Sequence, residues 1–572
     1  MIQIHVNGRP VHAEPGEMLL AVLRREGIRV PTLCHIDGLP PSGACRMCVV
    51  EIEGQRGLAP SCATPVQDGM KVHTQSQRVV QARRTIVELL LADHPDDCLY
   101  CVRSGNCDLR ALAEELGVRR RISSRPAKRV LDVSSPAIRR DPDKCILCGK
   151  CVRVCEEIQG VAAIDFVGRG AKSHIAAAFE EGLNVSSCIT CGQCVAVCPT
   201  GALTEQDDTK EVLNALADPD RFVVVQHAPA ISVTLGEELG LPAGCDVAGQ
   251  LNAVLRRLGF DRVFDTAFSA DLTIMEEASE LVHRLQNGGR LPMMTSCSPG
   301  WIKYVETFSP EHVANLSTCR SPQQMLGSLI KRYFAPKQGI DPARVMSVSI
   351  MPCTAKKFEA GRPEMGDCGL ADVDAVLTTR ELARLIRMHG FVMDELAPEP
   401  ADDPFGERTT AGRLFAATGG VMEAAVRTAY WMVTGRELEH LEVQDVRGLT
   451  GVKEARVQID GLDLGVAVAS GLGNARRLLD QLRQGRNDLH FIEVMTCPGG
   501  CIAGGGQPYG TNTESVQARM NALYKIDERG AVRVSHHNPA VQRLYDELLG
   551  APLSSKSHEL LHTHYAAREV LV

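Results

Sequence analysis

The sequence predicts a multidomain protein that combines α/β and α+β parts. With 572 residues the chain is too long for one hydrophobic core, so we expect three or more domains. Hydrophobic residues make up 44% and charged residues 23%, proportions typical of soluble globular proteins. Most of the 22 cysteines lie two or three residues apart in runs, and metal thiolates explain this spacing better than disulfides do.

Charge and hydropathy exclude several classes of protein. The net charge of −8 is small for this length and argues against a nucleic-acid-binding protein. No window approaches about 18 apolar residues, so we expect no transmembrane helix and no membrane partner. Residues 1–30 contain no apolar core behind a basic start, so we expect no signal peptide. Closely spaced thiols without an export signal predict a cytoplasmic protein.

Residues 1–78 are predicted to form a β-grasp domain that holds a 2Fe–2S cluster. The alternating stretch Ile2–Val6 continues into Asn7-Gly8, which is typical of a β-hairpin. A short helix is expected over 17–26, and cysteines then follow with the spacing C-x10-C-x2-C-x13-C. Four thiolates around a small sheet suit a 2Fe–2S cluster, with a structural zinc ion as the alternative. The predicted ligands are Cys34, Cys45, Cys48 and Cys62.

Residues 79–126 are predicted to form a small helical module with a 4Fe–4S cluster. A helix is expected from Val80 to Ala92, and it ends at His94-Pro95. The spacing H-x3-C-x2-C-x5-C gives the predicted ligands His94, Cys98, Cys101 and Cys107. A histidine beside a proline can simply end a helix, but here it is the only candidate for a fourth ligand. An imidazole in place of a thiolate should raise the reduction potential of the cluster.

Residues 127–208 are predicted to form a ferredoxin-like domain with two 4Fe–4S clusters. Two runs share the spacing C-x2-C-x2-C-x3-C. In such tandems the fourth cysteine of each run ligates the cluster of the other run. One predicted set is therefore Cys145, Cys148, Cys151 and Cys198, and the other is Cys188, Cys191, Cys194 and Cys155.

Together, the predicted clusters would form an electron-transfer chain. Accessory clusters pass electrons without making or breaking bonds, so electrons must enter or leave far from a reaction centre. The order of the modules resembles the electron-input subunit of respiratory complex I, certain formate dehydrogenases, and hydrogenases. The first 210 residues alone do not choose among these.

The remaining residues, 209–572, carry scattered cysteines inside unusual strings. The strings are Thr295–Trp301, Met351–Glu359 and Glu493–Pro508. Glycines from Gly499 to Gly506 allow the backbone to pass close to a bulky inorganic group. Three further cysteines, Cys245, Cys319 and Cys368, fit none of the predicted sites.

The three strings resemble the signature motifs of the iron-only (FeFe) hydrogenase catalytic domain. The resemblance continues through four more strings, Thr273–Glu277, Ser321–Gln324, Thr418–Glu423 and His558–His562. It covers nearly the whole chain, and the layout resembles the long clostridial form and the catalytic subunits of NAD(P)-linked, multi-subunit members. It implies reversible H2 oxidation in a two-lobed α/β catalytic domain. It also implies ferredoxin or a flavin-containing NAD(P)-reactive subunit as electron partner, and dedicated maturation enzymes.

The resemblance implies an active-site H-cluster, which is a 4Fe–4S cubane joined to a two-iron unit carrying CO, cyanide and azadithiolate. Cys353, Cys497 and Cys501 would ligate the cubane, and Cys501 would bridge to the two-iron unit. Lys356 would donate a charge-assisted hydrogen bond to a cyanide. The other implied cofactor contacts are Met351, Met495, Pro229 and Gln323, although plain core packing is the alternative for the methionines.

The first string departs from the family pattern. The family has two adjacent cysteines there, a proton donor and a cubane ligand, whereas this chain has Cys297 and Ser298. Ser298 could ligate iron, Cys297 could replace it as the ligand, or three thiolates could hold the cubane alone. Ser298 before Pro299 also fits an ordinary helix N-cap.

Protons need a route to a buried metal site. A helix is expected over 270–286, where Glu277, Glu280 and Arg284 fall on one face. Alone, this pattern is typical of a surface ion-pair face. The resemblance instead implies that these residues and Ser317 relay protons outward from Cys297.

Two alternatives to the enzyme remain at this point. One is a hydrogen sensor of the same superfamily, and the other is a non-catalytic iron–sulfur electron-transfer or assembly protein. Cyanide and CO bands in the infrared spectrum separate an enzyme with a two-iron unit from a protein that lacks it.

Overall fold

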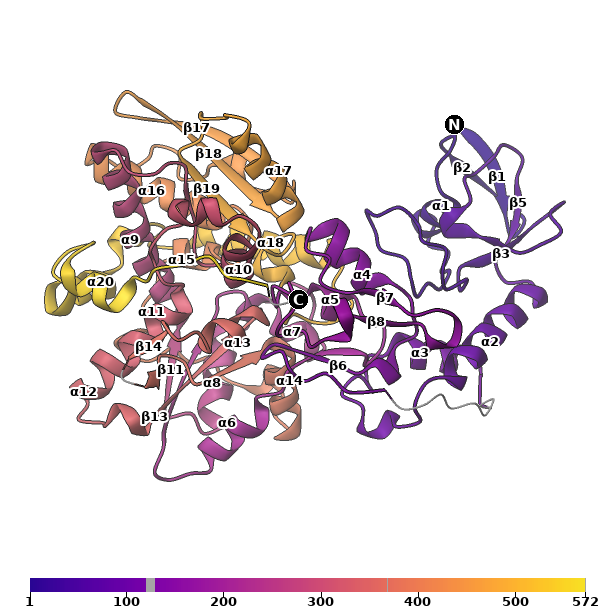
Figure 1. The fold of residues 1–572 in the computed structure, drawn as a ribbon, viewed down its shortest axis with the longest axis horizontal. Helices are drawn as coiled ribbons and strands as arrows, with labels where there is room; N and C mark the ends of the chain where they lie inside the picture. The colour runs from indigo at the N-terminus through magenta and orange to yellow at the C-terminus, as the bar shows by residue number, and fades with distance from the viewer. Residues whose placement is uncertain (120–128, 368, 571–572) are drawn as a thin grey trace.

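The structure is a computed structural model that describes residues 1–119, 129–367 and 369–570. Figure 1 shows an N-terminal sheet domain on one side, a middle region, and a large region that contains two further sheets. The prediction of a chain that mixes helices and sheets is confirmed. The predicted domain boundary at 126/127 and Cys368 lie outside the described residues.

The N-terminal sheet has five strands in the order β2-β1-β5-β3-β4. Asn7 and Gly8 both have positive φ, at 49° and 83°, and they connect β1 to β2 as the predicted hairpin. Strand β1 also pairs in parallel with β5, and the helix α1 packs its leucines into the core beneath the sheet. The bounds are β1 Ile2–Val6, β2 Arg9–Ala13, α1 Leu19–Arg25, β3 Val49–Ile52, β4 Ala59–Pro60 and β5 Lys71–His73.

Two helices follow the sheet domain, α2 (Gln77–Ala92) and α3 (Asp108–Glu115). Helix α2 contains the predicted helix, and Ser76 caps it by accepting a hydrogen bond from the Val79 backbone N–H at 3.3 Å. Leu33 and Met47 of the sheet domain pack with Val87 of α2. This shared apolar cluster joins the first two modules.

The middle region repeats one short pattern twice. Its strands pair as β6 with β9 and β7 with β8, both antiparallel. Each cysteine run leads into a short helix, α4 or α5, that begins after a glycine with positive φ. The bounds are β6 Ile138–Arg140, α4 Lys150–Arg153, β7 Asp165–Val167, β8 His174–Ala176, α5 Gln193–Val197 and β9 Leu203–Glu205.

The large region is built on two four-stranded sheets. One is parallel throughout, in the order β11-β10-β13-β16. The other has the order β12-β19-β18-β17, with only β17 antiparallel. The strands of the first sheet are β10 Phe222–His227, β11 Arg262–Asp265, β13 Val345–Met351 and β16 Ala375–Thr378. Those of the second are β12 Met293–Met294, β17 Val452–Ile459, β18 Leu462–Ser470 and β19 Phe491–Met495.

The strand ends explain where the unusual strings lie. Met351 is the last residue of β13 and Met495 is the last residue of β19. The string with Cys297 likewise follows β12. In parallel sheets, ligands bind beyond the carboxyl ends of the strands, so both sheets present their loops to a shared space.

Helix α9 (Thr266–Asn287) runs between the sheets and is buried along its first 16 residues except for one half-buried side chain, Ser279. It packs against α11 (Pro322–Leu329) and α16 (Gly420–Thr434). The predicted helix over 270–286 is therefore confirmed, but a solvent-facing position for it is wrong. Within the described residues, no helix combines the length and the apolar character that crossing a membrane requires.

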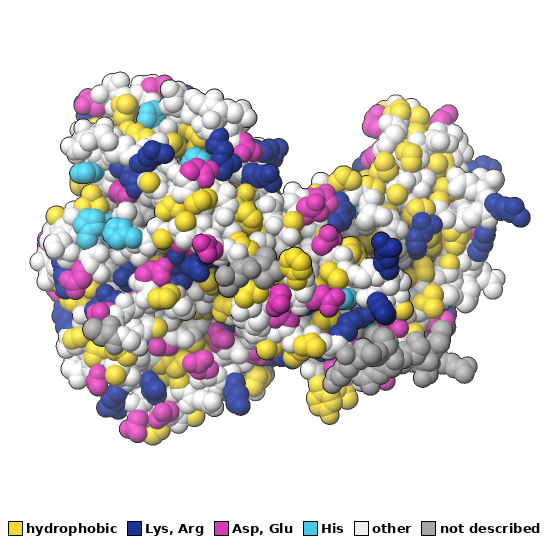
Figure 2. Space-filling view, viewed as in Figure 1, with side chains coloured by type: hydrophobic (Ala, Val, Ile, Leu, Met, Phe, Trp, Pro, Cys, Tyr) yellow, Lys and Arg dark blue, Asp and Glu magenta, His cyan; other side chains and the backbone are white. Residues whose placement is uncertain are grey.

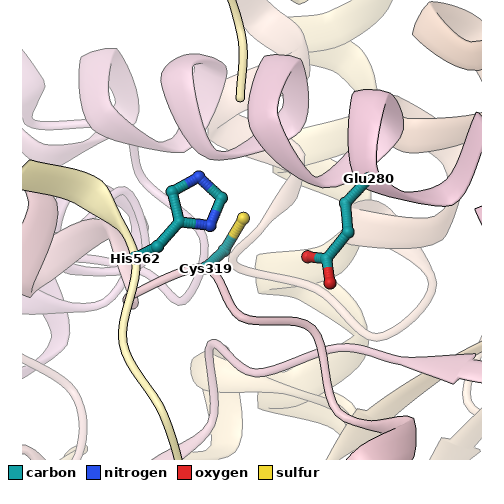
Figure 3. A group of neighbouring side chains, drawn as sticks. All are labelled: Glu280, Cys319 and His562. Carbon is teal, nitrogen blue, oxygen red and sulfur yellow. The ribbon is translucent and has the colours of Figure 1, made fainter. Parts of the chain in front are cut away.

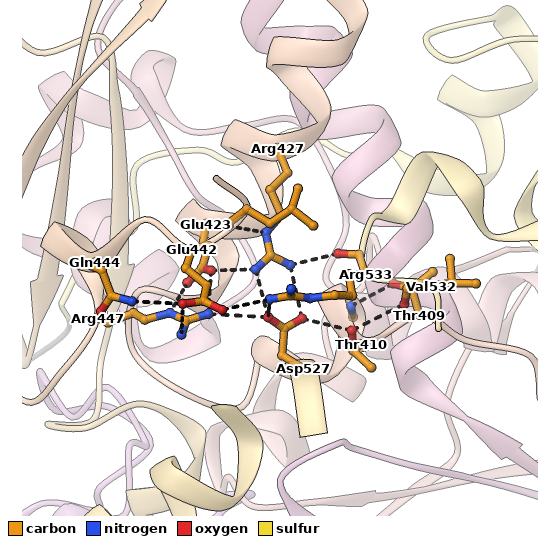
Figure 4. A network of polar contacts seen from close by, with 12 residues as sticks. Thr409, Thr410, Glu423, Arg427, Glu442, Gln444, Arg447, Asp527, Val532 and Arg533 are labelled. Atoms are coloured by element: carbon orange, nitrogen blue, oxygen red, sulfur yellow. Dashed lines mark hydrogen bonds and ion pairs between the residues drawn. The ribbon is translucent and has the colours of Figure 1, made fainter. Parts of the chain in front are cut away.

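A buried ionic network attaches α18 (Thr513–Arg529) to α16 (Figure 4). Arg427 donates to Asp527 at 2.9 Å and to Glu423 at 2.6 Å, and all three side chains are almost fully buried. Burial alone would raise the pKa of Asp527, but hydrogen bonds and charge from Arg427, together with Arg533, lower it. The carboxylate is thus ionised and matched by its arginines.

On the face drawn in Figure 2, acidic and basic side chains are interspersed rather than gathered by sign. The outline narrows between the N-terminal sheet domain and the rest of the molecule. A cleft of about 970 Å³ is lined there by residues of all the modules, among them His35, Arg103 and Tyr509.

Candidate functional site

A cavity of about 90 Å³ lies where the loops of the two large sheets meet. All ten residues that the sequence predicted to contact or serve the cofactor line this one cavity. They are Pro229, Cys297, Ser298, Gln323, Met351, Cys353, Lys356, Met495, Cys497 and Cys501.

Three of the cavity thiols form a close group. Burial raises the pKa of Cys497 above its usual range, and the neighbouring Cys353 and Cys501 raise it further. Burial and the proximity of Cys353 raise the pKa of Cys501 to about 12. Such thiols ionise only if a cation compensates the charge, which is what iron in a cluster supplies. The donor set therefore fits an iron–sulfur group.

Cys297 has a different neighbour. Its pKa is raised first by burial and next by the charge of Glu277, and only then by Cys501. The structure thus places Cys297 between the thiol group and the acidic side chains of α9. This position suits a thiol that exchanges protons with Glu277.

Ser298 takes the predicted N-cap position of α10 (Pro299–Phe308), with proline at the first helical position. Its side chain behaves differently from an ordinary cap. Within the described chain, its Oγ lies 2.7 Å from the Thr496 Oγ1 instead of accepting from the helix backbone. Thr496 precedes Cys497, so the Ser298 hydroxyl is turned toward the thiol group.

Lys356 is held by a carboxylate that sequence reasoning missed. Its Nζ donates to Glu359 Oε2 at 2.8 Å and to the Cys297 carbonyl oxygen at 3.2 Å. Gln323 donates to the same Glu359 oxygen at 3.0 Å. Glu359 is the last residue of the string Met351–Glu359, so the sequence did single out the segment. The role of Glu359 depends on contacts that residue spacing does not reveal.

The two cysteine runs of the middle region line two separate cavities. One cavity of about 30 Å³ is lined by Cys145, Cys148, Cys151 and Cys198. The other, of about 20 Å³, is lined by Cys155, Cys188, Cys191 and Cys194. The fold therefore brings together the exchanged sets that the tandem spacing predicts.

The two N-terminal sets differ in how far they are enclosed. Three thiols of the sheet domain are buried and Cys45 is half-buried, with Cys48 Sγ and Cys62 Sγ 3.3 Å apart. In the next module His94 is buried and Cys98 is exposed. The remaining cysteines of that module, Cys101 and Cys107, are half-buried.

Close contacts connect the His/Cys module with the tandem cysteine sets, and the tandem sets with the loop that carries the central thiols. A Cβ on Gly201 would lie 2.8 Å from Cys101 Sγ, and Arg103 donates to the Cys198 carbonyl oxygen at 2.8 Å. A Cβ on Gly505 would collide with the Cys191 carbonyl oxygen. Gln193 donates to the Ala503 carbonyl oxygen at 3.2 Å. The module cysteines, the tandem sets and the central thiols thus form a continuous series.

The acidic residues of α9 lead away from Cys297. Ser317 Oγ donates to Glu280 at 2.9 Å, and Arg284 donates to the other Glu280 oxygen at 2.5 Å. Glu277 is fully buried, and among the described residues its carboxylate makes no hydrogen bond of ordinary geometry, although the Ser317 hydroxyl and the Ser296 backbone lie close enough to lower its pKa. The surface ion-pair alternative is wrong because α9 is packed between the sheets.

Comparisons with known proteins give a consistent result. Residues 221–505 match a family model described as "Iron only hydrogenase large subunit, C-terminal domain". Residues 513–568 match one described as "Iron hydrogenase small subunit". A 2Fe-2S iron-sulfur cluster binding domain matches 1–77. An iron-sulfur binding region of NADH-ubiquinone oxidoreductase-G matches 83–121, and a ferredoxin-like domain of NADH-quinone oxidoreductase subunit 3 matches 135–204.

Individual proteins match over long stretches. An "NADP-reducing hydrogenase subunit HndD" of Solidesulfovibrio fructosivorans is 47% identical and covers 100% of both chains. "Iron hydrogenase 1" of Clostridium pasteurianum is 40% identical over 99% of this chain and 100% of its own. A solved apo FeFe-hydrogenase of Chlamydomonas reinhardtii is 43% identical, covers 63% of this chain and 99% of its own, and gives a TM-score of 0.57.

We predict that Glu277 is protonated at neutral pH. Burial, followed by the charge of Glu280, raises the pKa of Glu277 to about 8. The acid form should therefore persist below that pH and ionise above it. Infrared difference spectra should show a carboxylic acid band that disappears with a midpoint near pH 8. The band should be missing in Glu277→Gln and retained in Glu559→Gln, a change at an exposed glutamate.

The same glutamine substitution should lower hydrogen turnover by about 10²-fold or more, since an amide cannot carry the proton. A band that is already lost in mildly acidic solution, or turnover within a few-fold of the parent, contradicts this role.

Proposed function

The chain belongs to the iron-only hydrogenase family, and from that premise we propose how its residues divide the interconversion of hydrogen with protons and electrons. The protein is an oxidoreductase that acts on hydrogen and contains iron–sulfur domains for electron transfer. The observation that supports the residue assignment most is the single cavity that all ten predicted residues line.

The H-cluster, when bound, supplies the metal chemistry by which H2 is formed or split. Cys353, Cys497 and Cys501 would hold its cubane, with Cys501 as the bridge to the two-iron unit. Met351 and Met495 line the cavity, and their flexible apolar side chains would help to exclude water from the bound group. Lys356, oriented by Glu359, would donate a hydrogen bond to a cyanide of the bound group.

Ser298 is proposed as the fourth cubane ligand, and Cys297 as the proton donor. Two observations support this division. The Ser298 hydroxyl is turned toward Thr496 beside the thiol group rather than capping α10. Glu277 is the neighbouring group that most affects the pKa of Cys297, whereas Cys497 has Cys353 and Cys501 beside it. Cys297 Sγ would then exchange its proton with Glu277, and Glu277 with Glu280 by way of Ser317.

Electrons would pass through four accessory clusters, one 2Fe–2S and three 4Fe–4S. The four predicted ligand sets support this number, because two sets line cavities of their own and the other two lie in the matched iron–sulfur domains. Domain boundaries at 78, 126 and 208 would separate these modules from a two-lobed catalytic domain over 209–572. The abundance of closely spaced free thiols favours the reducing cytoplasm as the location.

A flavin-containing NAD(P)-reactive subunit is the proposed electron partner, with ferredoxin as the second candidate. Support comes from the relative named as an NADP-reducing hydrogenase subunit and from the NADH-oxidoreductase domains that match 83–121 and 135–204. Maturation enzymes would be needed to build the two-iron unit.

We predict that the purified, fully matured chain consumes H2 with an artificial dye as acceptor but does not reduce NAD(P)+ alone. The proposed clusters would pass single electrons, so hydride transfer to NAD(P)+ should require the flavin subunit. The test is a dye-linked assay beside an NAD(P)H absorbance assay, with and without the partner. NAD(P)H formation by the single chain would remove the need for that partner, and no dye reduction would remove the activity itself.

The proposed clusters predict about 20 iron atoms per chain after full maturation. Expression without the maturation enzymes should leave about 18, since the two-iron unit would be missing. Iron analysis per mole of chain is the measurement. A count of about 14 in the second preparation would mean that the cubane does not assemble, which would implicate Ser298.

Substitutions at the first string separate the two roles. If Ser298 is the ligand, Cys297→Ala should keep the cyanide and CO infrared bands and lose most turnover, because only the proton donor is removed. If Cys297 is the ligand, the same change should abolish bands and activity together. Ser298→Cys, which restores the adjacent cysteines of the family, should give a more stable cubane with equal or higher turnover. A destabilised cubane in this variant would speak against Ser298 as the ligand.

A further inference from the structure

Glu280 lies where several polar groups meet. Besides Ser317, the Thr318 backbone N–H donates to it at 3.0 Å and the Thr318 hydroxyl at 3.3 Å. Figure 3 shows the side chains of Glu280, Cys319 and His562 coming together from α9, the segment after Ser317 and the C-terminal segment. One polar atom from each of these three side chains lies within 4.8 Å of the other two.

Arg284 cannot pass a proton onward from Glu280. A guanidinium keeps its protons at any accessible pH, because its pKa exceeds about 12. Arg284 also donates to the Leu316 carbonyl oxygen at 2.8 Å, which fixes the side chain in place. Its contacts therefore fit a residue that positions Glu280 and stabilises its charge.

Thr318 and His562 offer the connection that Arg284 does not. His562 Nδ1 lies 2.8 Å from Thr318 Oγ1, and its Nε2 lies 3.1 Å from Glu276 Oε2. A neutral imidazole can accept a proton at one nitrogen and release another from the second nitrogen. Since both nitrogens already have oxygen partners, this geometry suits a proton carrier better than a metal ligand.

The surroundings hold His562 in this orientation. The Thr563 backbone N–H donates to the Thr318 carbonyl oxygen at 2.8 Å, and Arg320 donates to the His562 carbonyl oxygen at 3.0 Å. Burial would raise the pKa of Glu276, but hydrogen bonds from His562, Ser557 and Tyr545 lower it. An ionised Glu276 can accept a hydrogen bond from His562 Nε2–H, which leaves Nδ1 of the neutral ring to accept from Thr318.

His562 is also near solvent. Its side chain is 4% exposed, and the ring of His558, which is exposed on α20 (Ser555–Leu561), lies 4.4 Å away between centroids. The titratable and charged groups around His562 are Glu276 and Glu280 of α9, Cys319, Arg320 and His558, and Tyr545 donates to Glu276.

We propose that His562 is the outer proton carrier of this enzyme, connected to Glu280 through the Thr318 hydroxyl, and that Arg284 is a positioning residue. In the outward direction Glu280 gives its proton to Thr318 Oγ1, and the Thr318 hydroxyl proton moves to His562 Nδ1. His562 then releases a proton from Nε2 toward Glu276 and solvent. One proton enters and one leaves at each step, and no electron moves. The inference rests on the proposed relay through Glu277 and Glu280.

The test uses matured full-length protein with His562→Ala, Thr318→Val and Thr318→Ser. Turnover should fall by about tenfold or more in the first two variants, whereas the serine variant keeps the hydroxyl and should stay close to the parent. Added imidazole should restore much of the activity of His562→Ala. His564→Gln, at an exposed histidine two residues along the chain, is the matched control and should change nothing.

A second measurement does not depend on turnover. After a pH jump, the infrared band of the Glu277 carboxylic acid should relax more slowly in His562→Ala than in the parent, with cyanide and CO bands unchanged. Parent-like relaxation and turnover in His562→Ala, or a loss that imidazole does not rescue and Thr318→Val does not share, would overturn the proposal. If the parent itself turns over no hydrogen, the proposed function fails. If Glu277→Gln is inactive and His562→Ala is normal, only this inference fails.

Discussion

The rest of the structure depends on one constraint, the close packing of the loop over 499–506 against the backbone at Pro352 and Cys191. A side chain at Gly504 would strike the Pro352 carbonyl oxygen, and one at Gly505 would strike that of Cys191. Glycine at these positions lets one loop contact the string that holds Cys353 and the nearest accessory set at once. Electron tunnelling falls steeply with distance, so this packing decides whether the accessory modules can serve the central cavity.

The proposed proton route depends on a different feature, a row of acidic side chains buried away from solvent. Helix α9 carries Glu276, Glu277 and Glu280 into the core because its packing against α11 and α16 leaves no solvent face there. Desolvation raises the pKa of Glu277, and hydrogen bonds lower that of Glu276. Neighbouring carboxyls on one helix thus differ in proton affinity, so the proposed relay would have both a proton donor and a proton acceptor at hand.

Local patterns predicted much of this fold, and long-range contacts account for what they missed. The hairpin at Asn7-Gly8 and the helices α2 and α9 follow from turn chemistry and periodicity, and the exchanged tandem sets from spacing. The burial of α9, the turn of Ser298 toward Thr496, and the contact of Glu359 with Lys356 depend on segments far apart in sequence. His562 stood in a recognised string, but nothing local indicated that it reaches Thr318, 244 residues away.

The ionic network between Arg427 and Asp527 attaches the C-terminal part of the chain to the part that precedes it. The matches to a large-subunit and a small-subunit model stop at 505 and resume at 513, so the network joins two parts that are separate units in family terms. Separating the parts would break the ion pair that Arg427, which also pairs with Glu423 in its own part, makes with Asp527 in the other. The peptide link near 506–512 is therefore only one of the attachments, and noncovalent association could hold a nicked protein together.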